Sequence, residues 1–225
     1  METTCVCRYQ FGENIIEDAE PTSSQHPYAA IILYGNVSTT IYLPVCIGAI
    51  INNRSILTAL SCWNAPNNQI NLFRVRVGSD SATAGGSLHK IIRLISHSNY
   101  VLWNQANNIG IMRVDSDINF GTNVRPIPIA TTNSNLADYQ FVLAIKLIRT
   151  HIHGGTCQSS GRHEKDELCF LTTPLEQAGT SEQLSAVELR TINQGRCETI
   201  YGLNFVSASM LCAGWETGGR RVMPR

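Results

Sequence analysis

The apolar segments of this chain are short, and this shortness most restricts the folds that are open to it. Each segment is rich in Ile, Val and Leu and is bounded by Gly, Asn, Ser or Pro. Few windows are long and periodic enough for an amphipathic helix. Many short strands separated by turn residues predict an all-β barrel or sandwich. The segments are 29–34, 47–52, 73–77, 88–95, 109–114 and 141–148.

Length and charge narrow the classes of function. With 225 residues the chain can form one or two domains. It can bury roughly 70% of the surface that its unfolded state exposes. The formal net charge is zero and no basic cluster stands out, so we expect no nucleic-acid partner and no anionic membrane partner. No apolar run approaches the length of about 18 residues that a membrane-spanning helix needs.

Several sequence motifs occur along the chain in the order typical of one enzyme family. S-I-L-T-A-L-S-C at 55–62 resembles V-L-T-A-A-H-C, and C-I-G-A-I-I at 46–51 resembles C-G-G-[ST]-[IL]-[IL]. R-V-R-V-G-S at 74–79 and N-N-I-G-I-M-R at 107–113 resemble two further strands of that family. Together these motifs resemble those of the trypsin-like serine proteases.

The resemblance extends into the second half of the chain. V-R-P-I-P-I at 124–129 is similar to the family's linker between two barrels. T-S-E-Q-L at 180–184 and M-L-C-A-G-W at 210–215 resemble in particular the digestive trypsins of moths and butterflies. The chain is therefore identified as a degenerate member of the family over roughly residues 15–220.

This resemblance implies an all-β fold of two six-stranded antiparallel β-barrels. We expect a peptidase domain over residues 15–225, with the first barrel at about 15–125 and a partial second barrel at about 126–225. Residues 1–14 are expected to be the remnant of an N-terminal or pro segment. The second barrel is expected to be incomplete, because relatives form its last strands from sequence beyond the point where this chain stops. Unpaired edges would then favour aggregation of that half.

The resemblance also implies three catalytic positions, and none of them is expected to hold its catalytic residue. The triad needs a nucleophilic serine, a histidine that deprotonates it and an aspartate that orients the histidine. Ser61 stands at the histidine position and Asn108 at the aspartate position. Relatives carry the nucleophile in G-G-R-D-x-C-x-G-D-S-G-G-P, whereas this chain reads G-G-R-R-V-M-P-R at 218–225. We therefore expect base, acid and nucleophile all to be missing.

Activation by proteolysis is not expected either. Relatives are cut after Arg or Lys before I-V-G-G, and the corresponding stretch here is N-I-I-E-D at 14–18. An asparagine does not direct a tryptic cut, and two acidic residues replace the two glycines.

The eight cysteines favour disulfide bonds over metal or redox chemistry in such a relative of secreted enzymes. The resemblance implies that Cys46 pairs with Cys62 and that Cys197 pairs with Cys212. Cys5 and Cys7 have no counterpart in the family, and their pairing stays open.

Residues 144–176 depart from the family pattern. They contain Cys157 and Cys169, whose pairing also stays open, together with His151, His153 and His163. Imidazole and thiolate bind zinc, but the spacing matches no closed zinc finger, so we favour an exposed loop over a metal site. We expect no metal and no cofactor.

Several surface features complete these expectations. Asn36 and Asn53 each begin an N-x-S tripeptide and are candidate N-glycosylation sites. His26, His89 and His97 are expected to be exposed or half-buried structural residues. The resemblance implies an extracellular protein, although residues 1–8 contain no apolar signal core.

Three functions compete on this basis. We favour a catalytically inactive, truncated trypsin-like protein. The first alternative is a non-catalytic homologue that binds a protein partner, such as a protease, an inhibitor or an immune-cascade component. The second alternative is an active secreted endopeptidase, which family membership alone would suggest. Because fold does not imply function, the site must decide among the three.

Overall fold

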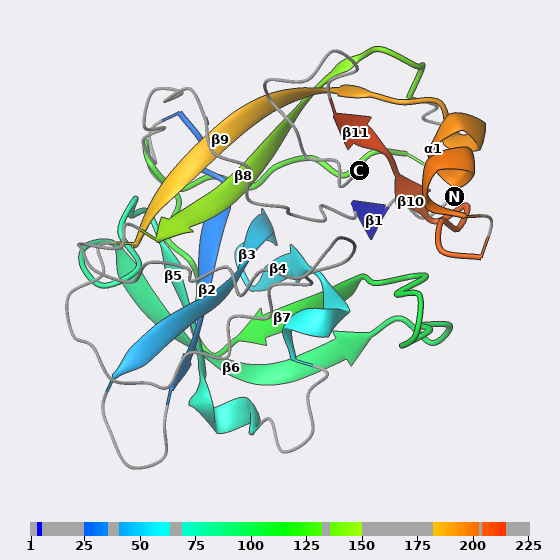
Figure 1. Cartoon of the computed structure of the whole chain (residues 1–225). Coiled ribbons are helices and arrows are strands. Elements are labelled where there is room, and N and C mark those ends of the chain that lie inside the picture. The colour runs from blue at the N-terminus through cyan, green and yellow to red at the C-terminus, as the bar shows by residue number, and fades with distance from the viewer. Residues whose placement is uncertain are drawn as a thin grey trace, which may run out of the picture.

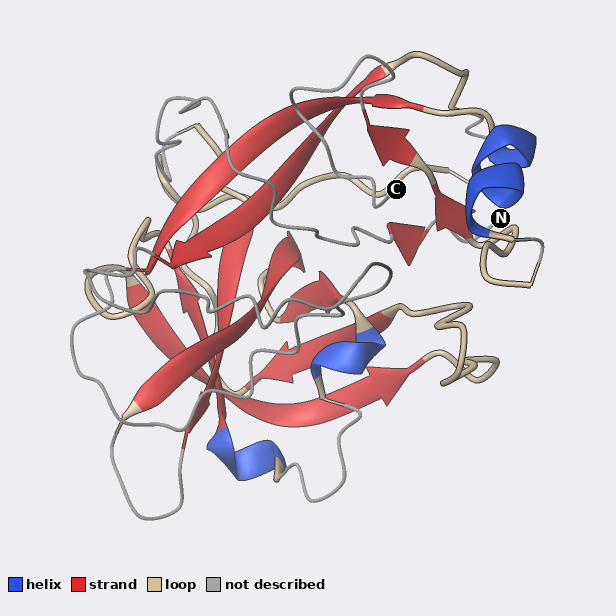
Figure 2. Ribbon diagram, in the orientation of Figure 1, coloured by secondary structure: helices blue, strands red, loops and turns tan. Residues whose placement is uncertain are grey.

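Strands make up most of the regular structure (Figures 1 and 2). The computed structural model describes residues 4–5, 25–35, 41–63, 69–131, 136–149, 182–202 and 204–214. The strands are β1 (Thr4–Cys5), β2 (Ala29–Gly35), β3 (Tyr42–Asn52), β4 (Ser55–Thr58), β5 (Phe73–Val77), β6 (Ser87–Ser96), β7 (Gly110–Val114), β8 (Phe141–Arg149), β9 (Glu182–Thr191), β10 (Met210–Leu211) and β11 (Ala213–Gly214). The 3-10 turns η1 (Leu60–Cys62) and η2 (Ile70–Leu72) and the helix α1 (Gln194–Tyr201) complete the described elements.

Six strands form a closed antiparallel barrel in the order β2-β3-β4-β7-β6-β5. Side chains alternate along β5, so that Phe73, Val75 and Val77 are buried while the arginines between them are partly exposed. This alternation fills the barrel with apolar side chains and confirms the predicted all-β class. The core comprises Ala30, Ile32, Ile50, Ile56, Leu60, Trp63, Phe73, Val75, Val77, Ile91, Met112, Val114 and Ile118.

A second sheet, in the order β11-β9-β8, lies against the outside of this barrel (Figure 1). Leu184 of β9 packs with Ile31 and Leu33 of β2 in a separate apolar cluster. The backbone N–H of Leu184 donates to the carbonyl of Asp80 at 2.9 Å. Because this sheet covers its outer face, β2 is buried on both faces, which explains its continuous run of apolar residues. Whether the second barrel is incomplete stays a prediction.

The remaining elements gather beside this second sheet. Asn193 caps α1 by accepting a hydrogen bond from the backbone N–H of Arg196 at 3.3 Å. A disulfide joins Cys197 of α1 to Cys212, which lies between β10 and β11. Strand β1 pairs with β10 in parallel, with Thr4 opposite Met210. None of the helices in the described part is long and apolar enough to cross a membrane.

His89 is buried, which corrects the expectation of an exposed or half-buried side chain. Only 6% of its surface is accessible, whereas His26 and His97 are half-buried as expected. Its Nε2 lies 2.9 Å from the hydroxyl of Ser87, and its Nδ1 lies 3.0 Å from the hydroxyl of Ser116. Hydroxyls can donate or accept, so they satisfy both nitrogens of a neutral imidazole. Burial lowers the pKa of His89 below its ordinary value of 6.5, and the charge of Asp115 opposes this shift.

We expect the stability of the fold to decrease as the pH falls below about 6.5, because His89 takes up its proton more readily in the unfolded state. The sign follows from the lowered pKa of His89. Between its folded-state and unfolded-state pKa values, the unfolded chain binds more protons than the folded chain. The stability contributed by the neutral, buried His89 is therefore fully present above pH 6.5 and is lost as the pH falls toward its folded-state pKa. Urea unfolding between pH 7.5 and pH 5 measures it. In His89→Gln the fall should be smaller, and an equal fall in both proteins would contradict this assignment.

Candidate functional site

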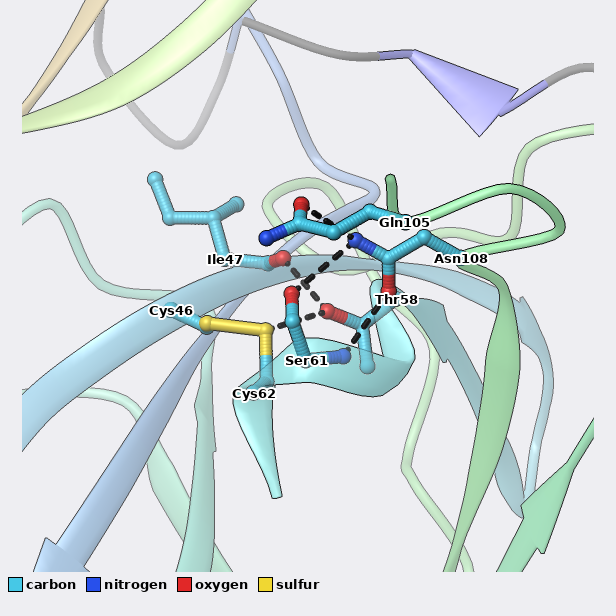
Figure 3. The surroundings of a disulfide bond; sticks show 7 residues. All are labelled: Cys46, Ile47, Thr58, Ser61, Cys62, Gln105 and Asn108. Atoms are coloured by element: carbon cyan, nitrogen blue, oxygen red, sulfur yellow. Dashed lines mark hydrogen bonds between the residues drawn. A yellow bond between two sulfur atoms is a disulfide. The ribbon is translucent and has the colours of Figure 1, made fainter. Parts of the chain in front are cut away.

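Two neighbouring barrel strands bring Ser61 and Asn108 together. Strands β4 and β7 are adjacent, and Thr58 at the end of β4 lies opposite Gly110 at the start of β7. Ser61 follows β4 within the turn η1, and Asn108 precedes β7 by two residues. Residues that are 47 positions apart in the sequence therefore face one another at one end of the barrel (Figure 3).

The contact between these two residues is a pair of hydrogen bonds. The Oδ1 of Asn108 accepts from the backbone N–H of Ser61 at 2.8 Å. The Nδ2 of Asn108 donates to the hydroxyl of Ser61 at 3.0 Å and also contacts the Oε1 of Gln105 at 3.3 Å. Asn108 is 6% exposed, so its amide is buried with both ends satisfied. Ser61 itself is exposed. The pair carries no charge and offers no group that titrates near neutral pH.

A disulfide fixes the turn that carries Ser61. Cys62 is bonded to Cys46 of β3, the pairing that the resemblance implies. Thr58 adds a second tie, because its hydroxyl donates to the carbonyl of Ile47 at 2.8 Å and lies 3.6 Å from the sulfur of Cys62. Figure 3 shows Thr58 and the disulfide beside Ser61. The backbone around Ser61 is therefore anchored to β3 as well as to β4.

The loop that leads to Asn108 is held in an unusual conformation. Gln105 and Asn107 both have left-handed backbone, with φ of 57° and 56°. For residues other than glycine this region is sparsely populated, and it occurs most often at functional sites and tight turns. The backbone N–H of Asn107 donates to the hydroxyl of Ser209 at 2.9 Å. The loop is therefore braced from outside the barrel.

This loop also makes an aromatic contact beyond the barrel. Trp103 and Phe205 meet edge to face with ring centroids 6.3 Å apart, and Asn104 donates to the carbonyl of Asn204 at 3.3 Å. Both aromatic rings stay more than half exposed, at 66% and 56%. Nothing in the linear sequence pointed to this contact or to Gln105, because both arise from where the loop lies in space.

Gly110 makes room for the indole that follows Cys62. Trp63 is 7% exposed, and a Cβ added at Gly110 would overlap its ring. A residue with a side chain at position 110 would therefore displace Trp63 from the end of the barrel. Gly110, two residues after Asn108, is thus part of how the local sequence packs the site.

Of the two predicted glycosylation positions, the structure describes Asn53 but not Asn36. Asn53 is exposed in the turn between β3 and β4, and its carbonyl accepts from the backbone N–H of Ile118 at 2.8 Å. The serine of that tripeptide, Ser55, is buried, and its hydroxyl accepts from Arg113 at 2.9 Å. Asn36 lies outside the described residues. Modification of either residue stays a prediction.

Other predicted features also lie outside the described part of the chain. These are the altered nucleophile region at 218–225, the activation stretch at 14–18, Cys7, and the residues Cys157 and Cys169. Of Cys5, the structure describes only the backbone, in β1.

Comparisons with known proteins match most of the chain. The family model described as Trypsin matches residues 15–224. Achelase-1 of Lonomia achelous is 33% identical over 209 residues, which is 92% of this chain and 85% of the relative. Trypsin, alkaline C of Manduca sexta is 33% identical, covering 92% of this chain and 72% of the relative. Trypsin CFT-1 of Choristoneura fumiferana is 34% identical, covering 92% of this chain and 72% of the relative.

Proposed function

The chain belongs to the trypsin family, and we propose that it is a catalytically inactive member of that family. The predicted family resemblance is thereby confirmed. The observation that supports inactivity is the uncharged hydrogen-bonded pair of Ser61 and Asn108 at the positions where the family motifs have the general base and its aspartate.

The chemistry of this pair does not replace that of histidine and aspartate. A serine hydroxyl cannot take up a proton near neutral pH, as an imidazole can. An amide at position 108 adds no negative charge, so it cannot stabilise an imidazolium. Instead, the Nδ2 of Asn108 donates to the hydroxyl of Ser61, and that hydroxyl acts only as an acceptor in this contact. The pair stabilises the turn without supplying a base.

No other histidine in the described part of the chain stands in for the base. Both nitrogens of His89 are engaged by Ser87 and Ser116. The Nδ1 of His97 accepts from the backbone N–H of Asn99 at 3.1 Å, and that of His26 lies 3.5 Å from the hydroxyl of Tyr28. The hydrogen bonds of Ser61 and Asn108 go to one another and to Gln105 and involve no described histidine, which argues against the active endopeptidase.

A role as a binding protein is the second candidate, and the intact framework around the site favours it. The barrel is closed, the Cys46–Cys62 disulfide is formed, and the buried amide of Asn108 keeps its hydrogen bonds despite the two substitutions. The family fold is thus retained where the base and acid are not. The two disulfides fit an oxidising compartment, so we place the protein outside the cell. A protease or an inhibitor remains the proposed partner class.

A serine-directed covalent probe tests the proposed inactivity. The purified protein is incubated with a fluorescent fluorophosphonate beside an active trypsin, and labelling is followed by gel fluorescence and peptide mapping. We expect no labelled serine, because the described residues offer no base that activates one. Rapid labelling of Ser61 or of any other serine would show an activated nucleophile and overturn the proposal.

A further inference from the structure

Strand β6 presents an alternating row of apolar and cationic side chains on the outside of the barrel. Leu88, Ile92 and Ile95 are exposed by 44%, 58% and 38%. Lys90 and Arg93 are also exposed and lie between them in the sequence. The register of β6 with β7 shifts between Ile91 and Arg93, and such a bulge lets Ile92 and Arg93 both face outward.

Cations on the neighbouring strands extend this row. Arg74 of β5 lies directly opposite Lys90, and Arg113 of β7 lies directly opposite Arg93. Like charges at opposed positions on the same face of a sheet destabilise it. We call the β6 row, with Arg74 and Arg113, the basic face.

The guanidinium groups of the two flanking arginines turn away from these neighbours. That of Arg74 lies 5.0 Å from the ring centroid of Tyr42 and donates to the carbonyl of Asn71 at 2.7 Å. That of Arg113 donates to the hydroxyl of Ser55. Neither contact involves a carboxylate, so the positive charge of both side chains is retained at the surface.

Few acidic groups neutralise the basic face. Within the described ranges, Arg54 forms an ion pair with Asp117. The carboxylate of Asp115 lies beside Lys90. Arg74, Arg93 and Arg113 make no ion pair with the described carboxylates. Since the whole chain is neutral, the excess of positive charge is local to this surface.

We propose that the basic face binds an extended segment of a partner protein in which acidic and apolar residues alternate. Carboxylates of such a segment would meet Lys90 and Arg93, and its apolar side chains would cover Leu88, Ile92 and Ile95. Residues 87–90 of β6 pair with β5 and residues 91–96 pair with β7, so we expect the partner to bind through the outward-facing side chains of the row.

The apolar part of the row decides the class of partner. Sulfated glycans and nucleic acids engage cations through their anionic groups and leave exposed aliphatic side chains without a partner. An acidic and apolar peptide satisfies the charges and also removes the three aliphatic side chains from water. The inference goes beyond the proposed loss of catalysis and does not depend on it, because the basic face includes neither Ser61 nor Asn108.

Fluorescence anisotropy with the full chain tests this inference. The probe is a labelled peptide as long as β6, 10 residues, in which glutamate alternates with leucine. An all-glutamate peptide, a heparin oligosaccharide and a short DNA duplex are measured in parallel. We expect the mixed peptide to bind most tightly, and to bind more weakly at 1 M salt, where the Debye length is only about 3 Å.

Matched variants locate the binding. Lys90→Gln combined with Arg93→Gln should weaken binding of the mixed peptide on the order of 10-fold. Ile92→Ser should weaken it by about 5-fold or more, because less apolar surface is buried. The controls are Arg196→Gln, which removes an exposed cation on α1, and Ile129→Ser, whose parent side chain is 61% exposed. Thermal melts establish that all variants fold.

Three results would overturn the proposal. The first is that the control substitutions weaken binding of the mixed peptide as much as the substitutions in the basic face do. Another is equally tight binding of the all-glutamate peptide, the oligosaccharide or the duplex, which would exclude a role for the apolar row. The third is no saturable binding of the mixed peptide at low salt. Because none of these readouts involves hydrolysis, they are separate from the test of inactivity.

Discussion

The purified protein is expected to hydrolyse arginine and lysine anilides no faster than buffer alone. Loss of the catalytic histidine by itself lowers the turnover of a serine protease on the order of 10⁶-fold. We infer that Ser61 stands at that position, and its hydroxyl is paired with the neutral amide of Asn108 instead of a carboxylate. Initial rates beside an equal concentration of an active trypsin measure the difference.

The matched control for this assay is Ser61→Ala, prepared in the same way. Both proteins should give the same background rate, because the hydroxyl of Ser61 has no catalytic part. Turnover that is present in the original chain and absent from the Ser61→Ala variant would place Ser61 in the chemistry. That result would contradict the proposed inactivity, whereas equal traces in both preparations would indicate a contaminating protease.

Replacing Cys46 and Cys62 together by alanine is expected to lower the free energy of unfolding by about 3 kcal/mol. The bond closes a loop with a sequence separation of 16, and the chain-entropy model assigns roughly this value to such a loop. For a chain of this size, the corresponding loss in melting temperature is about 6–12 °C. Calorimetry under non-reducing conditions measures it. Peptide mapping of the original chain should also find Cys46 bonded to Cys62, and a bond to Cys157 or Cys169 would contradict the barrel assignment.

The second disulfide provides a control of nearly equal loop length. Cys197 and Cys212 are separated by 15 positions, so the entropic model predicts a similar loss of stability when both become alanine. Only the first pair anchors η1, so only its removal should speed hydrogen exchange at the backbone amide of Ser61. Equal exchange in the two variants would show that the disulfide does not hold the site.

Local sequence pattern predicted the strands whose residues alternate or form apolar runs. The segment 73–77 coincides with β5, and 29–34 lies within β2. Strand β9 was not among the predicted segments, because its sequence, E-Q-L-S-A-V-E-L-R-T, is largely polar. It becomes a strand through its nine-residue pairing with β8 and through Leu184, which packs on β2. Pairing partners of this kind are distant in the sequence and leave no local pattern.

The sequence by itself determined the all-β class and the family, and it predicts Ser61 and Asn108 at the base and acid positions. These follow from short-range patterning and from motifs whose order along the chain is preserved. Tertiary structure alone decided how Ser61 and Asn108 hydrogen-bond, that His89 is buried, and that cations from three strands share one face. The sequence shows no basic cluster because Arg74 and Arg113 are far apart along it. The barrel brings them together, since antiparallel pairing across β5, β6 and β7 sets the register of all three strands.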